Sequence, residues 1–151
     1  MKENQFNTEI KNSLEEQGAW AYKIPDSPTS WTAHRTRFTP EKPCDIVGCY
    51  KSVGFLIEGK QSKKFEAFNI NEVRASQQKN MDMAVDKGNR AFIFLNVRIA
   101  KPYENRLIIM DWAEVRDSLR NESIKAKQIK ELPYTTGKKG RFDLSEFLEG
   151  L

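Results

Sequence analysis

The sequence predicts an α/β fold in which helices flank a mixed sheet, with the core order helix, strand, strand, strand, helix, strand. An amphipathic segment opens the chain, and two short strand-like segments lie on either side of residues 51–52. An apolar run at 91–99 is typical of a strand buried on both faces. The 151 residues are enough to bury a core and few for two domains, so we expect a single domain over residues 1–151.

The first third of the chain is expected to contain a helix, a strand and a long arm. The helix spans about residues 7–17, and Asn7 or Thr8 is a suitable N-cap. Its apolar stripe consists of Phe6, Ile10 and Leu14. A strand follows at 19–24. From about 25 to 43 the sequence is polar, basic and interrupted by prolines, which predicts a protruding basic arm or stalk.

The middle of the chain is expected to form the central sheet. Strands at 45–50 and 53–60 meet at Lys51-Ser52, and a helix over about 71–87 follows them. The apolar strand at 91–99 completes the core. The tail is expected to add smaller pieces: an edge strand at 106–112 and short helices capped by Asp111 and Asp143.

The positive charge of the chain is grouped. The net charge is +4 and the pI about 9.0, which is mild overall. The basic clusters lie at residues 34–37, 60–64, 125–130 and 138–141. Such clusters fit a polyanion such as nucleic acid, and the alternative is that they are solvated charged faces.

The sequence also indicates the cellular compartment of the protein. No apolar run approaches the roughly 20 residues of a membrane span, and the N-terminus lacks the features of a secretory signal. We therefore expect a cytoplasmic protein without a membrane partner. In that compartment Cys44 and Cys49 are expected to be free thiols, because one pair without further cysteine or clustered histidine predicts neither zinc nor a disulfide.

Three charged residues are predicted to converge on the two strands that meet at Lys51-Ser52. If those two residues form the whole turn, Tyr50 pairs with Val53 and counting outward places Asp45 opposite Glu58. Opposed residues share a sheet face, with Cβ atoms roughly 4.5–5.5 Å apart. The period of two adds Lys60 to the same face. Lys-Ser is not a favoured turn pair, so a longer loop and another register are the alternative.

Two facing carboxylates repel each other unless a cation or a shared proton lies between them. Carboxylate oxygens suit Mg²⁺, which takes one or two carboxylates together with waters and substrate phosphate. A lysine beside them can support an attacking water or the transition state. The arrangement indicates phosphodiester hydrolysis, and the alternative is that Asp45 and Glu58 are ordinary hairpin surface residues.

The segment from Asp45 to Lys60 resembles the PD-(D/E)xK nuclease superfamily, which includes restriction enzymes and Holliday junction resolvases. The resemblance implies a restriction-endonuclease-like core and assigns catalysis to Asp45, Glu58 and Lys60. It implies that Mg²⁺, with Mn²⁺ as a substitute, is held by Asp45, Glu58 and the backbone carbonyl of Gly59. The proline that names the motif is displaced, since Pro43 lies two residues before Asp45.

The helix that follows resembles the RecU group of resolvases more narrowly. The run Phe-Glu-Ala-Phe-Asn-Ile-Asn-Glu-Val-Arg-Ala-Ser-Gln-Gln at 65–78 keeps the Gln of that group's His-Gln pair as Gln77, with Ser76 in place of the His. Helical spacing places Gln77 on the buried side of its helix, where a polar side chain needs a hydrogen-bond partner. The alternative is that backbone groups, and not the site, supply its hydrogen bonds. Glu9 matches an acidic residue of resolvases that faces the metal, and its alternative is an exposed helix position.

RecU-like proteins are homodimers that bind four-way junctions with a stalk between the first two strands, where this chain has its arm. The resemblance therefore implies a homodimeric, metal-dependent resolvase that nicks four-way DNA junctions. Residues expected to contact DNA are His34, Arg35, Arg37, Lys63 and Lys64. Two alternatives remain, a restriction- or repair-type nuclease on linear DNA and a catalytically silent junction-binding protein. The short length suggests a phage or prophage source.

Overall fold

A computed structural model of the chain describes residues 3–26, 42–119 and 123–151. Within these ranges a seven-stranded mixed sheet has the order β1-β2-β3-β5-β6-β8-β9, in which β3 and β5 are parallel neighbours and the other neighbours are antiparallel. Its strands are β1 (Trp20–Lys23), β2 (Ile46–Tyr50), β3 (Val53–Ser62), β5 (Arg90–Ile99), β6 (Glu104–Asp111), β8 (Thr135–Lys138) and β9 (Arg141–Phe142). A second sheet pairs β4 (Phe68–Asn69) with β7 (Ser123–Ile124).

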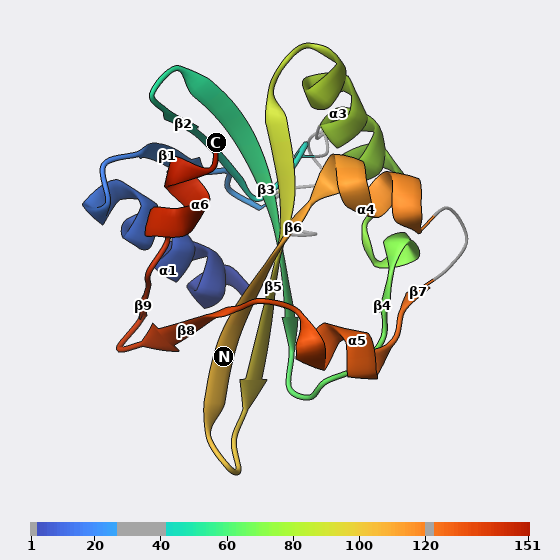
Figure 1. Cartoon of the computed structure of the whole chain (residues 1–151). Helices are drawn as coiled ribbons and strands as arrows, with labels where there is room; N and C mark the ends of the chain where they lie inside the picture. Colours follow the sequence, from blue (N-terminus) through green and yellow to red (C-terminus); the bar gives the residue numbers. More distant parts are fainter. Residues whose placement is uncertain (1–2, 27–41, 120–122) are drawn as a thin grey trace, which may run out of the picture.

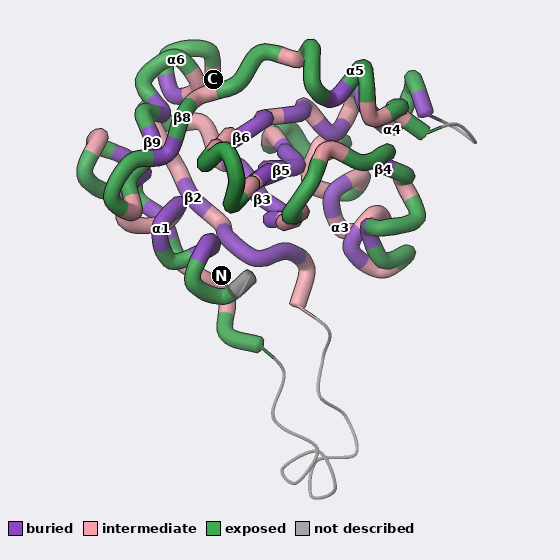
Figure 2. The backbone as a smooth tube through the Cα atoms, turned by 90° about the horizontal axis from the view of Figure 1, so that it is seen from below, coloured by how far each residue is buried: buried purple, intermediate pink, exposed green. Residues whose placement is uncertain are grey.

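Helices cover both faces of the large sheet (Figure 1). The helices are α1 (Glu3–Glu16), α3 (Ala75–Asp86), α4 (Trp112–Ser118), α5 (Ala126–Glu131) and α6 (Ser145–Glu149), with a 3₁₀ turn η1 (Ile70–Glu72) before α3. One hydrophobic cluster joins α1 and α6 to the sheet, and another joins α3, α4 and α5 to its opposite face. Figure 2 shows the strands as a buried layer between α1 and α3. None of the helices in the described part of the chain is long and apolar enough to cross a membrane.

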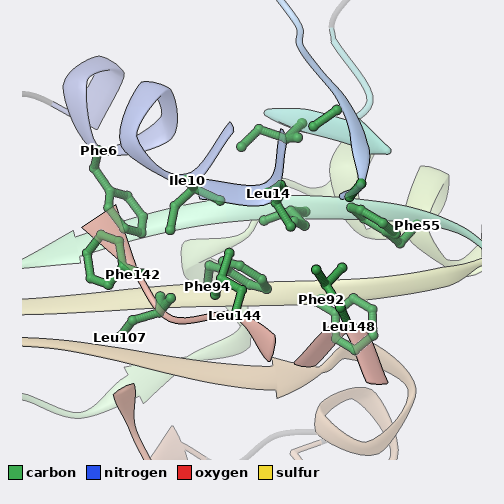
Figure 3. Close-up of a cluster of buried hydrophobic side chains, with 14 residues drawn as sticks. Phe6, Ile10, Leu14, Phe55, Phe92, Phe94, Leu107, Phe142, Leu144 and Leu148 are labelled. Carbon is green, nitrogen blue, oxygen red and sulfur yellow. The ribbon is translucent and has the colours of Figure 1, made fainter. Parts of the chain in front are cut away.

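The first helix packs as its stripe predicts but starts earlier. Phe6, Ile10 and Leu14 are completely buried and lie over the strands in Figure 3. The helix begins at Glu3, so the prediction that Asn7 or Thr8 caps it is wrong. The polar residues before Phe6 add a further turn that the apolar spacing does not reveal. Asn7 therefore lies inside the helix, on the buried side.

The hairpin of β2 and β3 has the predicted register. The pairs run from Tyr50↔Val53 to Ile46↔Ile57, joined by the two-residue turn Lys51-Ser52. Both turn residues are left-handed, with φ of 46° and 69°. This is the pattern of a type I′ turn, whose twist matches that of the strands. The turn is adopted although neither residue is glycine or asparagine.

The next helix is shorter than predicted. Asn69 and Glu72 form a reciprocal capping box that fixes the 3₁₀ turn, and Val73 is extended, so α3 begins only at Ala75. Local capping thus divides the segment expected as one helix over 71–87. Gly88, with φ of 97°, follows its end as predicted.

Strand β5 is the predicted centre of the sheet, because seven consecutive residues from Ala91 to Val97 are buried. The prediction that its neighbour is an edge strand is wrong. β6 lies inside the sheet, since β8 pairs with it at Arg106 and Leu107. The strand that covers this edge comes from the tail, where short segments give little periodic signal.

The C-terminal segment is fastened to α1. The Phe142 N–H donates to Ser13 Oγ at 3.1 Å and the Leu144 N–H to Gln17 Oε1 at 2.8 Å. Asp111 caps α4 as predicted, accepting from the Ala113 N–H. Asp143 accepts from the Ser145 N–H, although Leu144 occupies the N-cap of α6. These contacts curl the sheet so that its last strand returns to the first helix.

Candidate active site

An open cavity of about 150 Å³ lies where the β2–β3 hairpin meets α3. Four predicted catalytic residues line it together: Asp45, Glu58, Lys60 and Gln77. Residues not predicted as part of the site complete the lining: Asn4, Asn7, Asp26, Lys42 and Arg74. The sheet register and one turn of helix therefore bring together residues that lie far apart in the sequence.

Asp45 is fixed from several sides at the entry to β2. Its backbone N–H donates to the Ile57 carbonyl at 3.0 Å, just beyond the last strand pair. Its Oδ2 accepts from the Gly59 N–H at 2.8 Å, and its Oδ1 lies 2.8 Å from the Lys42 ammonium. The residue is only 3% exposed, so the carboxylate is held in one orientation with little access to water.

Glu58 is the electrostatically strained member of the pair. It is 2% exposed, and its Oε1 accepts from Gln77 Nε2 at 3.1 Å, with Lys60 Nζ 3.7 Å away. Its Oε2 is buried and has no hydrogen-bond partner among the described residues. Burial, and then repulsion from Asp45, raise the pKa of Glu58 to about 8. A cation between the carboxylates would relieve both effects.

The carboxylates of Asp45 and Glu58 fit a hard divalent ion whose other ligands are water molecules and substrate phosphate. The described residues contain no group of three or more His, Cys, Asp or Glu side chains that could hold a metal. Two carboxylates are what Mg²⁺ commonly takes from a protein, the rest being waters and substrate phosphate. The Glu58 Oε2, which has no hydrogen-bond partner among the described residues, is available to such an ion.

Lys42 is a member of the cavity that sequence reasoning did not place in the site. Its ammonium lies 2.7 Å from Asp26 Oδ1 as well as 2.8 Å from Asp45 Oδ1. Burial lowers its pKa, yet hydrogen bonds to the two carboxylates outweigh this and the pKa is raised. The only signal in the sequence is its position three residues before Asp45.

The helix α1 contributes Asn7 to the cavity, whereas Glu9 does not line it. The Glu9 carboxylate lies 3.2 Å from Arg98 on β5, at 9% exposure. Asn7 has the i, i+3 and i, i+7 relation to Ile10 and Leu14 that could have revealed its burial. Its Oδ1 packs against Gly59, where an added Cβ would collide with it. Gly59 is therefore required for this close approach of helix and strand.

Two of the five predicted DNA contacts, Lys63 and Lys64, are among the described residues, and neither lines the cavity of Asp45 and Glu58. Both are exposed, just beyond the end of β3, and Lys64 shares a small hollow of about 50 Å³ with Lys60. His34, Arg35 and Arg37, together with most of the arm expected at 25–43, lie outside the described residues.

The two cysteines are free thiols, as predicted. Cys44 precedes Asp45 and is buried, with its Sγ 3.2 Å from the Ile46 carbonyl. Burial and the nearby Glu58 carboxylate raise its pKa to about 12, so the thiol is neutral at physiological pH. It adds no negative charge to the site.

The fold is that of a known nuclease class. A solved structure described as Archaeoglobus fulgidus Hjc, a Holliday junction resolvase from an archaeal hyperthermophile, matches with a TM-score of 0.55 at 17% identity. The match covers 86% of this chain and 93% of that one. The curled mixed sheet with its flanking helices is a restriction-endonuclease-like fold, and this prediction is confirmed. No curated protein matches the chain.

The sequence matches the family described as Recombination protein U (RecU) over residues 3–148. The chain therefore belongs to the RecU family of Holliday junction resolvases, and the predicted family and function are confirmed. Membership makes it a nuclease that acts on DNA junctions. Resolvases of this type use divalent metal ions, bind branched DNA and often act as dimers.

Proposed function

We propose that this chain is a Mg²⁺-dependent endonuclease that nicks four-way junctions by phosphodiester hydrolysis at the cavity of Asp45 and Glu58. The observation that carries the proposal is a pair of buried carboxylates facing a cavity that also holds Lys60, one of them with an oxygen that no described residue hydrogen-bonds. Asp45, Glu58 and the backbone carbonyl of Gly59 would hold the ion, for which Mn²⁺ substitutes. The bound ion would supply Lewis acidity and neutralise charge on a phosphate oxygen.

The other residues of the cavity position these groups and receive the substrate. Gln77 holds Glu58 through its 3.1 Å hydrogen bond, which leaves Oε2 free to act as a ligand. Lys60 lies beside Glu58 and would orient the attacking water or stabilise the transition state. Arg74 lines the same cavity at the start of α3, where its guanidinium suits a phosphate of the backbone.

We further propose that branched DNA is the preferred substrate and that two copies act together. The predicted contacts of His34, Arg35, Arg37, Lys63 and Lys64 would add affinity through backbone phosphates. Because this function requires access to DNA, we place the protein in the bacterial cytoplasm, with a phage or prophage source as a further part of the proposal. Glu9, paired with Arg98, would have a supporting rather than a metal-facing role.

An open strand edge supports a homodimer. β8 pairs with β6 only at Arg106 and Leu107, so the residues 108–111 have no strand partner on that side within the described ranges. Two hollows, one of them mainly apolar, flank this edge and share Ile109 and Pro133. An antiparallel strand from a second copy would cover the edge by a self-complementary contact. The molar mass in solution tests this, and a monomer at micromolar concentration would contradict it.

The experiment for the nuclease compares a four-way junction with linear duplex of the same sequence, with Mg²⁺ and with chelator. Asp45→Asn should reduce junction cleavage at least about 10³-fold, roughly 4 kcal/mol of transition-state stabilisation. The matched control is Asp117→Asn, an exposed carboxylate beside Arg116. Equal cleavage of both DNAs would contradict the junction preference, and unchanged cleavage by Asp45→Asn would contradict the site. Junction binding without metal binding or cleavage would indicate a catalytically silent binder.

A further inference from the structure

Lys42 joins two carboxylates of very different exposure. Its ammonium is 2.8 Å from Asp45 Oδ1 and 2.7 Å from Asp26 Oδ1, and the lysine side chain is 19% exposed. The Asp45 side chain is 4% exposed, whereas that of Asp26 is 68% exposed. Lys42 thus lies between the floor of the cavity and its rim, with one acidic partner at each level.

The oxygen that Lys42 occupies is the one a metal ion would need. Oδ2 of Asp45 already accepts a hydrogen bond from the Gly59 N–H, a backbone group within β3. Oδ1 is therefore the remaining oxygen of Asp45, and Lys42 holds it. On Glu58, Oε1 is engaged by Gln77 and Oε2 is unpartnered among the described residues. Lys42 therefore neutralises, at Asp45 Oδ1, the charge that a divalent ion held by Asp45 and Glu58 would neutralise, so the two cations would compete.

We propose that Lys42 is the internal counter-cation of the metal-free site, that it competes with the divalent ion for Asp45 Oδ1, and that Asp26 retains Lys42 when the ion binds. This inference rests on the proposed metal site at Asp45 and Glu58. The affinity for metal is then set by an exchange of cations. Lys42 opposes loading, and Asp26 favours it by offering the ammonium a second partner.

The exchange has a low cost in this geometry. Lys42 already contacts Asp26, so it needs only a small displacement to leave Asp45 while staying ion-paired. Without Lys42, the two buried carboxylates would share the cavity with Lys60, 3.7 Å from Glu58, and Arg74, and Asp45 would lose its ion pair at 2.8 Å. Lys42 thus stabilises the folded protein before metal binds, and the same charge weakens binding of the ion.

Substitutions of Lys42 and of Asp26 should change the metal affinity in opposite directions. Lys42→Met removes the competitor and should bind Mn²⁺ about tenfold more tightly than the wild type. Asp26→Asn leaves Lys42 with Asp45 alone and should bind about three- to tenfold more weakly. Lys42→Arg keeps the charge and should stay closer to the wild type. Titration calorimetry or Mn²⁺ electron paramagnetic resonance on the full chain, without DNA, measures each affinity independently of cleavage.

Matched controls come from the surface ion pair of Lys11 and Glu15, which lie 3.1 Å apart on α1. Lys11→Met and Glu15→Gln change the net charge by the same amounts and should each shift Mn²⁺ affinity by less than about twofold. An Asp45→Asn variant should lose the site altogether. If the wild type binds no Mn²⁺, the proposed metal site and this inference both fail.

If the wild type binds Mn²⁺ through Asp45 but Lys42→Met binds no more tightly, the metal site stands and the inference is overturned. The inference is also overturned if Asp26→Asn binds Mn²⁺ as tightly as the wild type does. A weakening in both variants would overturn it as well, because it would show that Lys42 and Asp26 only support the shape of the site.

Discussion

The two faces of strand β3 differ in what they bury. Residues 55, 57 and 59 point to the α1 and α6 side, where the side chains Phe55 and Ile57 are sealed in an apolar cluster. Leu56, Glu58 and Lys60 point to the α3 side, where the apolar contacts stop at Glu58 and the cavity begins. Alternate residues of a single strand thus supply stability on one face and chemistry on the other.

The apolar face is closed by aromatic packing. The Phe147 ring lies edge-on to Phe55, Phe92 and Phe94, with centroids 4.8–5.8 Å apart. On the opposite face a buried carboxylate oxygen has no partner within the described residues. The comparison indicates that the apolar face supports a site that is itself unfavourable for folding. A substitution on the apolar face should therefore lower stability and change cleavage little. A substitution of Glu58 on the other face should raise stability and abolish cleavage.

The largest effect on stability is expected from the apolar face. Phe94 is completely buried and its ring centroid is 5.2 Å from that of Phe147. Phe94→Ala should lower the free energy of unfolding by about 3–5 kcal/mol through lost burial and a residual cavity. Urea unfolding followed by circular dichroism measures it. Phe94→Leu keeps more apolar volume and should lose less.

Cleavage by the molecules that remain folded should be changed little in Phe94→Ala, because the substitution lies on the face away from the cavity. A loss of cleavage much greater than the loss of folded protein would show that the two faces are coupled more strongly than the geometry indicates.

A smaller change in stability, of opposite sign, is expected from the face of β3 that carries Glu58. The pKa of Glu58 is raised to about 8 in the folded protein, against an ordinary value of 4.5. Folding therefore favours the protonated carboxyl group of Glu58. The stability of the folded protein is highest, as far as Glu58 determines it, below about pH 4.5, and this stability is lost as the pH rises towards 8. In chelator, Glu58→Gln should become more stable than the wild type by about 1–3 kcal/mol between pH 5 and pH 8, while cleavage is lost.

The measurement is the difference in unfolding free energy between the two proteins at several pH values, so that groups common to both cancel. Mn²⁺ should stabilise the wild type at pH 8 and leave Glu58→Gln almost unaffected. A difference that does not vary with pH would show that Glu58 titrates normally in the folded state.

The sequence predicts much of the catalytic face because its signals are local or periodic. The count from Lys51-Ser52 gives the register as far as Ile46↔Ile57, and the next residues outward, Asp45 and Glu58, both line the cavity. The helical spacing of Gln77 predicts its burial, and the structure adds Glu58 as its partner. Both deductions need only the geometry of one hairpin or one helix.

The remaining parts of the site depend on contacts between distant segments. Asp26 and Lys42 meet across an interval for which spacing makes no prediction. Glu9 is directed to Arg98 by the way α1 crosses the sheet, an angle that a helical stripe does not specify. The strand β8 completes the sheet beside β6 with only two paired residues, too few for a periodic signal.

The smallest change in stability should come from the turn that connects β2 to β3. Ser52 is left-handed, with φ of 69°, which is unfavourable for a residue with a Cβ. Ser52→Gly should raise the free energy of unfolding by about 0.5–1 kcal/mol, and Ser52→Ala, which keeps the Cβ, should give no gain. The midpoint of urea unfolding measures both, with an unchanged slope if the native state is the same.

Cleavage by Ser52→Gly tests whether the hairpin register positions Asp45. If the register from Tyr50↔Val53 to Ile46↔Ile57 sets the distance between Asp45 and Glu58, Ser52→Gly preserves it and cleavage stays within about twofold of the wild type. A variant with one glycine inserted between Lys51 and Ser52 loses this two-residue turn, and any one-residue shift of pairing would turn Asp45 away from Glu58. Cleavage that survives the insertion, in a folded protein, would mean that the position of Asp45 is set by Gly59 and Lys42 rather than by the hairpin.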